Sequence, residues 1–438
     1  MMKVDEEHAS KKAKVTRTGK QSKRKRMIGG YFNVLPCEIL HEIALMLPFT
    51  SIKSLRCSCM FLYNILTDNK FVDMHWTREL QKPVGYLFTP FYKYCHGRRE
   101  VYIVEQSGDE FITSKMFEYS TNIEVNKMSR FQSSGGLMCV YMTLSNCFRI
   151  FNPNIAEEVQ VRNAPIFKKC RHWWFFCYSP STKEYKILKL GVLLRNNSIE
   201  STVGAIYTLG SNIWRKIKQN IPHQYFDNFV ECQGNLFWMK KRCLISFDLV
   251  SEEFHVSCGP QRKRTSFNAD RVECVGLKAG RLINMGHTIG CIHDYILWVL
   301  EDRTKGIWIK RHEFLNLQSY RNRKLVGILE NGNLFGFEEL SANVFIQHIG
   351  CSHITDMKIS KVMKRIAYVA PHVRSFVSPV RIMAMGKNKQ VYDHCHVGDI
   401  SHERKWVLDT LKLGDDATED DLFHRMYEVL NLQPQLKG

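Results

Sequence analysis

The sequence lacks the long apolar segments that would place a protein in a membrane or send it out of the cell. No uninterrupted apolar run approaches the roughly 18 to 20 residues that a membrane-spanning helix needs, although 44% of the 438 residues are hydrophobic. The N-terminus is rich in lysine, but no apolar stretch follows it, as a secretory signal would require. We therefore expect a protein that stays inside the cell and does not enter a membrane.

Paired Cys-x-x-Cys knuckles, which are typical of structural zinc sites, are also missing. The 15 cysteines are scattered, and inside the cell we expect them to be reduced. The sharpest metal candidate is His394-Cys395-His396 with His402 nearby. Adjacent residues cannot all point at one tetrahedral ion, so a polar loop explains them more simply. We expect no bound metal.

Catalytic and cofactor motifs are absent as well. The sequence contains no Walker loop, no dinucleotide-binding fingerprint and no Gly-x-Ser-x-Gly elbow. Ser, His and Asp occur without a recognisable catalytic spacing. We expect no cofactor and no intrinsic enzymatic activity.

Acidic residues are too few to balance the basic ones, and the net charge is +19. Residues 1–26 hold ten Lys or Arg against three acids, so this tail contributes +7 and the rest of the chain +12. We expect a disordered basic tail over residues 1–30. Two clusters in it have the spacing of a bipartite nuclear import signal, which binds an import receptor. They are Lys11 and Lys12, followed after ten residues by Lys23, Arg24, Lys25 and Arg26.

Two other interpretations of this charge stay open. The tail can be a solvated basic segment that has no targeting function, because basic runs of this kind are common. The whole chain can instead be a nuclear nucleic-acid-binding or scaffold protein, whose affinity for nucleic acid would fall steeply with salt. We favour the nucleus as the location, with the cytoplasm as a second one, and do not expect nucleic acid as the main partner.

Residues 31–80 form a short leucine-rich block of helical patterns. Pro36 suits the first turn of a helix, where its missing N–H is harmless, and Pro48 ends that helix. Thr50 is suited to cap the next one. Apolar residues recur at helical spacing in successive groups: Ile39, Leu40, Ile43 and Leu47; Ile52, Leu55 and Cys59; Leu62, Ile65 and Leu66; Phe71, Met74 and Leu80. A unit this small cannot bury all of them, so some must face a partner or another domain.

The block resembles the F-box of plant F-box proteins along its whole length. The matching residues are Leu35-Pro36, Glu38-Ile39-Leu40, Leu47-Pro48, Ser51-Ile52, Leu55-Arg56-Cys57 and Phe71. In that family the module docks onto the Skp-type adaptor of an SCF ubiquitin ligase. The resemblance implies an adaptor-binding role for Leu35, Pro36, Ile39, Leu40, Leu47, Pro48, Ile52 and Leu55. Where the family usually has Val and then Lys-Ser-Trp, this chain has Ser58 and then Met60-Phe61-Leu62.

A generic three-helix bundle, such as a helix-turn-helix DNA reader, is the alternative for this block. Its recognition helix would present Arg, Asn or Gln to base edges, whereas these helices present Leu, Ile and Cys. The residue types therefore favour protein docking.

From residue 85 to residue 380 the pattern changes to short strands between turn signals. A hairpin unit with an aromatic residue near the end of its first strand recurs at 148–159, 175–187, 205–214, 244–254 and 297–308, with a weaker copy at 334–337. Gly-Asn turns at 233–235 and 331–333 indicate a second kind of hairpin. Two hairpins make a four-stranded sheet, and the repetition favours a β-propeller over a β-sandwich.

This region resembles the F-box-associated, kelch-like propeller of plant F-box proteins. The matching segments are Gly136-Leu-Met-Cys139, Phe151-Asn-Pro153, Tyr178-Ser-Pro180, Glu184-Tyr-Lys-Ile187, Asn212-Ile-Trp214, Phe247-Asp248, Glu253-Phe254, and the closing stretch from Tyr368 through Ser375 to Pro379. The expected fold class is a small all-α F-box followed by an all-β propeller-like domain with a short helical C-terminal tail.

Aromatic and basic clusters in this region admit a functional and a structural interpretation. Residues 173–176, Trp-Trp-Phe-Phe, can stack on a ligand, but packing between blades is the favoured role. Basic pairs and runs at Arg98-Arg99, Arg262-Lys263-Arg264 and Arg321-x-Arg323-Lys324 fall in expected loops. We hypothesise that Arg262, Lys263 and Arg264 bind an acidic or phosphorylated target. Arg321, Arg323 and Lys324 are possible second contributors if the fold brings them to the same face.

Residues 381–438 depart from the propeller pattern. Thr418 can cap a helix, and Leu422, Met426, Val429 and Leu430 form an apolar stripe along it. Packing onto the body is the favoured role for this helix, and a partner or dimer helix is the alternative.

These features together predict a non-catalytic substrate receptor of an SCF-type ubiquitin ligase. The F-box would bind the Skp-type adaptor and, through it, a cullin, while the propeller would bind the protein substrate. Catalysis would arise from proximity to a ubiquitin-charged enzyme elsewhere in the complex.

Overall fold

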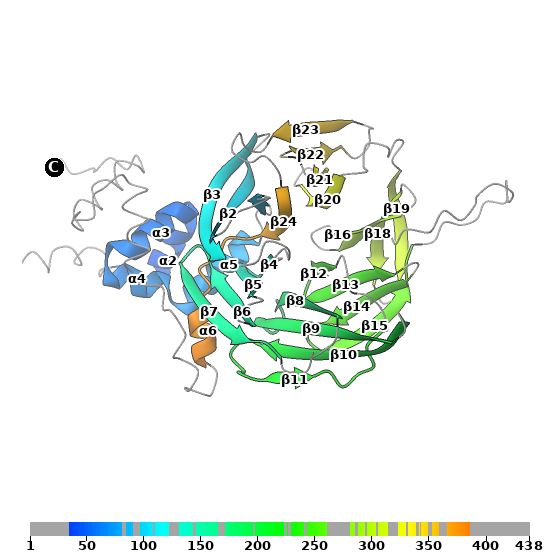
Figure 1. The fold of residues 1–438 in the computed structure, drawn as a ribbon. Helices are drawn as coiled ribbons and strands as arrows, with labels where there is room; N and C mark the ends of the chain where they lie inside the picture. The colour runs from blue at the N-terminus through cyan, green and yellow to red at the C-terminus, as the bar shows by residue number, and fades with distance from the viewer. Residues whose placement is uncertain are drawn as a thin grey trace, which may run out of the picture. The chain divides into compact units, whose positions relative to one another are not determined.

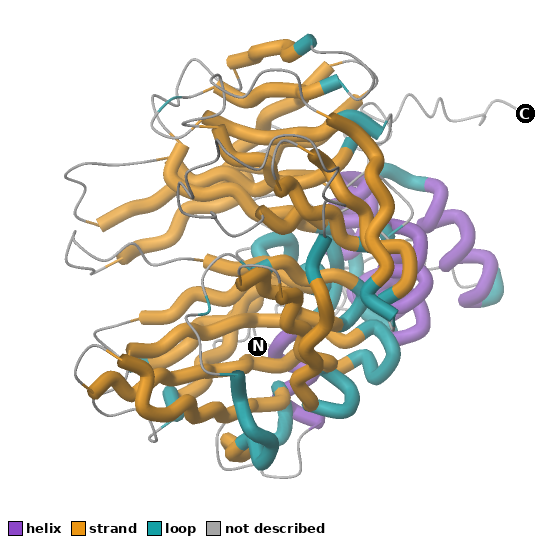
Figure 2. Tube along the Cα trace, turned by 90° about the vertical axis from the view of Figure 1, so that its right-hand side faces the viewer, coloured by secondary structure: helices purple, strands orange, loops and turns teal. Residues whose placement is uncertain are grey.

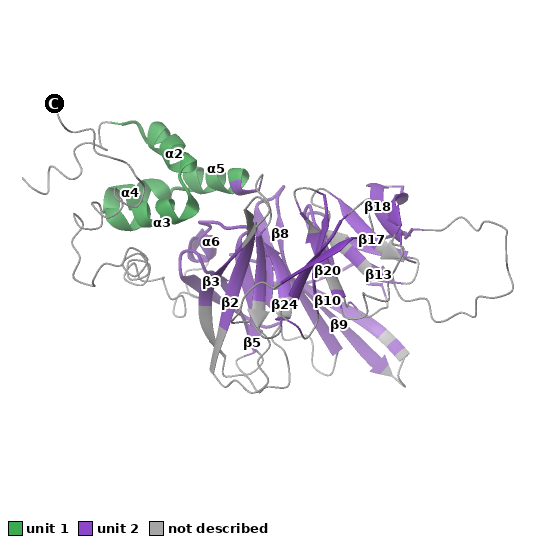
Figure 3. Ribbon diagram, turned by 90° about the horizontal axis from the view of Figure 1, so that it is seen from above, with its two compact units in different colours: residues 1–78, 399–438 green, residues 79–398 purple. Residues whose placement is uncertain are grey.

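The computed structural model divides the chain into two compact units, one with the helices up to Arg78 and one with the strands (Figure 3). It describes residues 35–385 except 81–84, 91–96, 108–109, 122–130, 143–145, 165–170, 196–197, 223–225, 227–228, 241–242, 261–280, 285–287, 294–295, 304, 314–322, 330–331, 339–340, 342, 349–352 and 359–365. The basic tail, the His394–His402 cluster and the helix expected near Thr418 lie outside the described residues.

Four short helices follow one another in the first unit (Figure 1). They are α2 (Cys37–Met46), α3 (Phe49–Ser58), α4 (Met60–Leu66) and α5 (Asn69–Glu79). Pro36 and Pro48 each precede a helix in extended geometry, with ψ of 146° and 150°. The carbonyl of Pro36 accepts hydrogen bonds from the N–H groups of Ile39 and Leu40, so the proline begins the helix without needing an N–H of its own.

The expected capping role of Thr50 is wrong. Pro48 occupies the cap position of α3, and Thr50 lies inside the helix, where its carbonyl accepts a hydrogen bond from the Ser54 hydroxyl at 3.1 Å. The proline already sets the extended geometry that a capping residue provides, so α3 begins one residue before Thr50.

The helices pack around a small apolar interior. Its buried residues are Leu40, Ala44, Phe49, Ile52, Leu62, Ile65, Leu66 and Phe71. The buried His41 ring lies 5.4 Å from Phe71 and its Nε2 lies 3.2 Å from the Ile65 carbonyl, which joins α2 to α4. Asp68 accepts a hydrogen bond from the Lys70 N–H and so caps α5.

The second unit is a ring of six four-stranded antiparallel sheets, which we call blades 1 to 6 (Figure 1). The blades are blade 1, β24 (Ile366–His372), β1 (Gly85–Pro90), β2 (Gly97–Ser107) and β3 (Glu110–Thr121); blade 2, β4 (Phe131–Ser134), β5 (Leu137–Met142), β6 (Cys147–Asn152) and β7 (Glu157–Arg162); blade 3, β8 (Arg171–Ser179), β9 (Glu184–Arg195), β10 (Ser198–Thr208) and β11 (Trp214–Lys216); blade 4, β12 (Val230–Cys232), β13 (Asn235–Lys240), β14 (Cys243–Asp248) and β15 (Glu253–Cys258); blade 5, β16 (Arg281–Asn284), β17 (Ile289–His293), β18 (Ile296–Asp302) and β19 (Ile307–Glu313); and blade 6, β20 (Arg323–Ile328), β21 (Leu334–Glu338), β22 (Asn343–Gln347) and β23 (Ile354–Lys358).

Pairing between the two ends of the strand region closes the ring. β24 pairs antiparallel with β1, from Gly85 opposite His372 to Pro90 opposite Ile366. β24 thereby becomes the inner strand of blade 1 and contacts the inner strands of blades 2 and 6, β4 and β20. This closure excludes the β-sandwich and confirms the expected fold class of helices followed by a propeller.

The hairpin units expected from the sequence are real, but two of them belong to one blade. The 175–187 hairpin is β8 with β9, and the 205–214 hairpin is β10 with β11, and all four strands form blade 3. The pairing of β9 with β10 joins them, for example Ile187 opposite Tyr207. Two hairpins do make one four-stranded sheet, as expected, but 175–187 and 205–214 are the inner and outer hairpins of the same blade and not two copies of one unit.

Several hairpins share one four-residue turn. In three of them the residue before the turn uses a side-chain oxygen to accept backbone N–H groups: Asn152 for Asn154, Asp248 for Val250 and Ser251, and Asp302 for Lys305. The last turn residue has positive φ, 55° at Ala156, 56° at Lys183 and 58° at Glu252. These local interactions explain why the turn motif could be recognised in the sequence.

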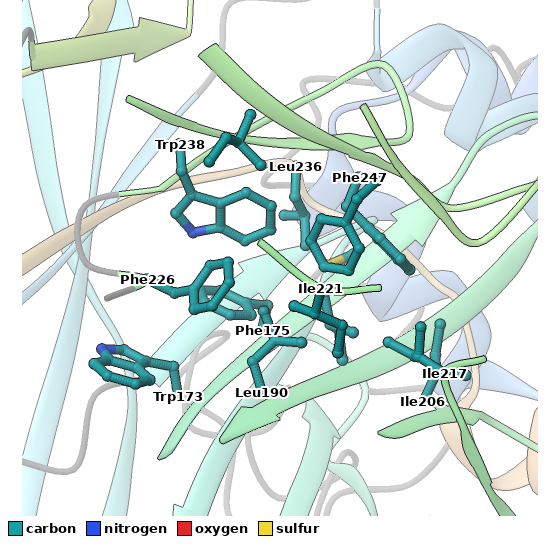
Figure 4. Packing of buried hydrophobic residues seen from close by; sticks show 14 of the residues in the cluster. Trp173, Phe175, Leu190, Ile206, Ile217, Ile221, Phe226, Leu236, Trp238 and Phe247 are labelled. Carbon is teal, nitrogen blue, oxygen red and sulfur yellow. The ribbon is translucent and has the colours of Figure 1, made fainter. Parts of the chain in front are cut away.

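The apolar core lies between facing blades (Figure 4). One cluster joins blades 3 and 4 through Phe175, Trp238 and Phe247, and the Phe175 and Trp238 rings lie 5.1 Å apart. Trp173 and Phe175 face blade 4, whereas Trp174 and Phe176 pack towards blade 2. The packing role favoured for residues 173–176 is confirmed, because Trp173, Phe175 and Phe176 are buried.

A segment after the last strand returns to blade 2. The buried Asn152 amide donates hydrogen bonds to the carbonyls of Ser375 and Val377 at 3.0 and 2.8 Å, and the Ser375 hydroxyl donates to the Gly136 carbonyl. The short helix α6 (Pro379–Met385) follows, and its Met383 packs into the cluster between blades 2 and 3. The closing motif seen in the sequence therefore fastens the end of the propeller to blade 2.

The alternating direction of the strands places different loops on the two faces of the ring (Figure 2). The four-residue turns and the tight Gly135-Gly136 and Gln233-Gly234 turns lie on one face, which we call the turn face. The connections between blades, such as the one from Cys258 to Arg281, begin and end on the opposite face, which we call the connection face.

Candidate functional site

The first candidate site is the outer side of α2. Leu40, His41 and Ala44 face the interior, whereas Leu35, Ile39, Ile43 and Met46 are exposed. Ile39, Ile43 and Met46 follow one another by four and three residues, which places them along one side of α2, and Leu35 lies just before the helix. The exposed fractions of Leu35, Ile39, Ile43 and Met46 are 39%, 46%, 46% and 77%. We call these four residues the outer stripe of α2.

The residues expected to bind the adaptor divide between this surface and the interior. Leu35, Pro36, Ile39 and Pro48 are exposed, and Leu47 and Leu55 are partly buried. Leu40 and Ile52 are buried, so any effect they have on docking must act through the shape of the helices. An adaptor-binding role for these residues remains a prediction.

Sequence reasoning left two stripe residues out of the site. Ile43 was recognised as part of a helical pattern but not as a contact residue, and Met46 was missed. They lie one and two helical turns beyond Ile39, and the i, i+4, i+7 spacing was the available indication. Successive residues on a helix point about 100° apart, so Ile39 and Leu40 cannot share one side.

Charged residues border the outer stripe of α2. Glu38 is exposed, and its backbone hydrogen bond together with the nearby Lys70 lowers the pKa of its carboxyl. Glu42 is also exposed. An apolar stripe rimmed by charged residues on a small helical unit is typical of a protein-docking surface.

The second candidate site is the connection face of the propeller. Arg262, Lys263 and Arg264 belong to the segment between Cys258 and Arg281 and lie outside the described residues. The ends of β15 and β19, which precede the two basic clusters in the chain, both open on the connection face. Arg323, the suggested second contributor, already pairs with Asp356 at 2.7 Å and stacks 5.1 Å over Phe345, which fixes it within blade 6.

Polar groups on the inner strands tie neighbouring blades together. The Ser134 hydroxyl donates to the Glu231 carboxylate at 2.6 Å, and the Tyr178 N–H points to the same oxygen at 3.3 Å. Desolvation raises the pKa of Glu231 to about 7. Ser133 bonds the buried His372 ring at 2.8 Å, and burial lowers the pKa of His372 to about 3. Sequence reasoning missed both groups, because nothing local marks them.

The described residues contain no cluster of three or more His, Cys, Asp or Glu that could hold a metal ion. Among these residues, no helix combines the length and apolarity that crossing a membrane requires.

Comparison with known proteins identifies the family. The sequence model of the F-box associated β-propeller domain matches residues 94–367, from just before β2 into β24. An F-box protein of Arabidopsis thaliana is 26% identical over 280 residues, which cover 58% of this chain and 70% of that protein. An F-box/kelch-repeat protein of the same plant is 26% identical over 272 residues, covering 55% and 66%.

Among solved structures, the nidogen/laminin complex is similar at a TM-score of 0.40 and 8% identity, covering 66% of this chain and 99% of that one. The sequence matches indicate no enzyme family. Six closed blades, the match over 94–367 and the plant relatives agree with one another, and the chain belongs to the F-box associated β-propeller family of plant F-box proteins.

Proposed function

We propose that this chain is the substrate-recognition subunit of an SCF-type ubiquitin ligase. The helical unit binds a Skp-type adaptor and, through it, a cullin, and the propeller binds the protein to be ubiquitinated. The chain contributes no catalytic group and acts by holding its target near a ubiquitin-charged enzyme.

The outer stripe of α2 is the observation that carries this proposal. Exposing the four large apolar residues of the stripe to water is unfavourable, by roughly 25 cal/mol for each Å² of apolar surface. A partner that covers the stripe removes this cost. The stripe begins at the Leu35-Pro36 pair, which matches the docking motif of the F-box.

The stripe can be tested in the full chain by replacing both Ile39 and Ile43 with Asp. The exposed positions tolerate the change, so we expect normal far-UV circular dichroism and an unchanged melting temperature. Binding to a purified Skp-type adaptor should weaken by about 100-fold or more, because two charges would be buried without partners. Biolayer interferometry measures this affinity.

Asn64→Asp is the matched control, because it adds a charge at an exposed position of α4, outside the stripe and its charged border. It should bind the adaptor as the wild type does. Full adaptor binding by the Ile39→Asp/Ile43→Asp variant would refute the docking role of the stripe.

Target recognition in this proposal belongs to the connection face. The turn face is occupied by short turns that pack on neighbouring blades, as Gly234 does against Pro180, whose ring would lie only 3.0 Å from a Cβ at position 234. The longer connections open on the other face, where a rigid ring can position variable residues. Arg262, Lys263 and Arg264 remain the proposed contacts for an acidic or phosphorylated target.

We also propose that the chain works in the nucleus, with Lys11, Lys12 and the 23–26 cluster as its import signal. Deleting residues 1–26 should abolish nuclear accumulation of a fluorescent fusion in plant cells while adaptor binding persists. Unchanged nuclear accumulation would refute the proposed import signal. Loss of salt-sensitive binding to nucleic acid on the same deletion would instead favour the nucleic-acid alternative.

A further inference from the structure

Two exposed cysteines face each other at one end of blade 4. Cys243 is the first residue of β14 and Cys258 is the last residue of β15, and they are direct partners in the antiparallel register. Both are exposed free thiols. Directly opposed residues of an antiparallel pair point to the same side of the sheet, so the two side chains start in parallel.

The hairpin fixes which kind of pair they form. Both backbone polar groups of Phe254 bond the Gln219 side chain: its N–H donates to the Gln219 amide oxygen and its carbonyl accepts from the Gln219 amide nitrogen at 3.1 Å. Neither group faces β14, so Phe247 and Phe254 are a non-hydrogen-bonded pair, and the Cys243–Cys258 pair lies four positions further along the same ladder. Hydrogen-bonded and non-hydrogen-bonded pairs alternate along the ladder, so Cys243 and Cys258 form a non-hydrogen-bonded pair. Such pairs have Cα atoms about 4.5 Å apart, within the range of about 4.4–6.8 Å that a disulfide needs.

The backbone at this pair is held from outside the hairpin. The indole N–H of Trp308 in blade 5 donates to the Cys258 carbonyl at 3.0 Å. The bond anchors the last residue of β15, so bringing the two sulfur atoms together requires side-chain rotation and little backbone movement.

Four other cysteines among the described propeller residues have different surroundings. Cys139, Cys177, Cys232 and Cys291 are buried, and burial raises the pKa of each thiol, to about 11 for Cys232 and about 12 for Cys291. Because the thiolate is the reactive form, these four are poor targets for oxidants. Cys37 is exposed on α2 and offers a comparison for a reactive thiol outside the propeller.

We propose that Cys243 and Cys258 are a reversible redox site that closes into a cross-strand disulfide under a hydroperoxide. One thiolate attacks an oxygen of the hydroperoxide and becomes a sulfenic acid, and the other oxygen leaves as an alcohol, or as water when the oxidant is hydrogen peroxide. The second thiolate attacks the sulfenic sulfur, which forms the S–S bond and releases the sulfenic oxygen as water. Two thiols are oxidised, one hydroperoxide is reduced, and a dithiol reductant reverses the reaction.

The position of this pair suggests what the bond would control. Cys243 directly follows the connection at 241–242, and Cys258 precedes the one that contains Arg262, Lys263 and Arg264. A disulfide would covalently link the two strand ends, on the connection face, at which these connections start or finish. This consequence rests on the proposed role of that face in target binding, whereas the redox site itself does not.

The sequence permits a direct assay of the bond. Trypsin leaves both cysteines in one peptide, 243–262, because no Lys or Arg lies between them, and cleavage after Glu252 or Glu253 splits that peptide in two. The full chain is treated with hydrogen peroxide and alkylated with iodoacetamide under denaturing conditions. It is then cut with trypsin and with a protease that cleaves after glutamate. We expect the two halves to stay linked in mass spectra and to separate after dithiothreitol.

Cys243→Ser and Cys258→Ser should each abolish the linked fragment, and Cys37→Ser should leave it intact. Unchanged melting temperatures of the reduced variants confirm that the substitutions spare the fold. Separate alkylation of both thiols after peroxide treatment, or their predominant linkage to other cysteines, would overturn the proposal. Loss of target binding without a linked fragment would concern the proposed function alone.

Discussion

Ile39 and Ile43 on α2 each expose 46% of their surface, whereas Phe175 and Trp238, on facing blades of the propeller, expose 2% and 1%. The helical unit and the propeller both carry large apolar side chains, but they differ in how these side chains are shielded from water. Each blade is covered by its neighbours, and closure through β24 leaves no blade at an open end. Four short helices cannot cover both sides of α2, so the uncovered side becomes available to a partner.

Exposed apolar residues on the propeller are arranged differently. They are spread over several blades: Ile213 and Val250 lie in turns of blades 3 and 4, and the pair Ile307 and Ile309 lies on β19 of blade 5. Single exposed apolar residues are common in soluble proteins, whereas three at helical spacing on one short helix, with Leu35 just before it, indicate an interface.

The largest expected effect is the contrast between a buried and an exposed apolar residue. Trp238→Ala should lower the free energy of unfolding of the propeller by about 3–5 kcal/mol, because it leaves a cavity between blades 3 and 4. Ile43→Ala should change stability by less than about 0.5 kcal/mol. Urea unfolding followed by far-UV circular dichroism measures both. Equal destabilisation would mean that the stripe is packed and not available for docking.

An intermediate effect is expected at Glu231, where the propeller buries a polar group between blades. Because the folded pKa is raised to about 7, the folded state binds the proton more tightly than the unfolded state does. The stability from this group is therefore present below the ordinary Glu pKa and is lost as the pH rises to about 7. Glu231→Gln keeps an oxygen acceptor for Ser134 but does not ionise.

The unfolding free energy of the wild type should fall relative to that of Glu231→Gln as the pH rises from 5 to 8. We expect this change to reach about 2 kcal/mol, less than the full pKa shift would give, because Glu231 is partly exposed. His372 has the opposite pH dependence but is common to both proteins, so it cancels in the difference. A difference that stays constant with pH would show that Glu231 is ionised throughout.

The smallest effect is expected at the segment that returns to blade 2. Ser375→Ala removes the hydrogen bond to the Gly136 carbonyl and should cost about 1 kcal/mol. Ser211→Ala, at an exposed turn, is the control and should cost less. Thermal melts of both variants test this, and equal losses would mean that the returning segment adds no more stability than a surface turn.

Local chemistry in the sequence accounts for much of the architecture. Pro36 and Pro48 mark the starts of helices, and Asn152-Pro153, Asp248 and Gly234 mark hairpin turns. These effects act between residues a few positions apart, so a single sequence displays them. The helical block, the repeated hairpins and the propeller class could therefore be predicted.

Tertiary contacts decided the rest, because burial depends on residues that are far apart in the chain. Helical spacing marked Ile39 and Leu40 as apolar, but only the packing of the four helices turned Leu40 inward and left Ile39 exposed. The merging of two hairpins into blade 3 required the pairing of β9 with β10, and ring closure required β1 to meet β24. Glu231 acquired its raised pKa from burial beside Ser134 and Tyr178 of two other blades, a neighbourhood that no local pattern encodes.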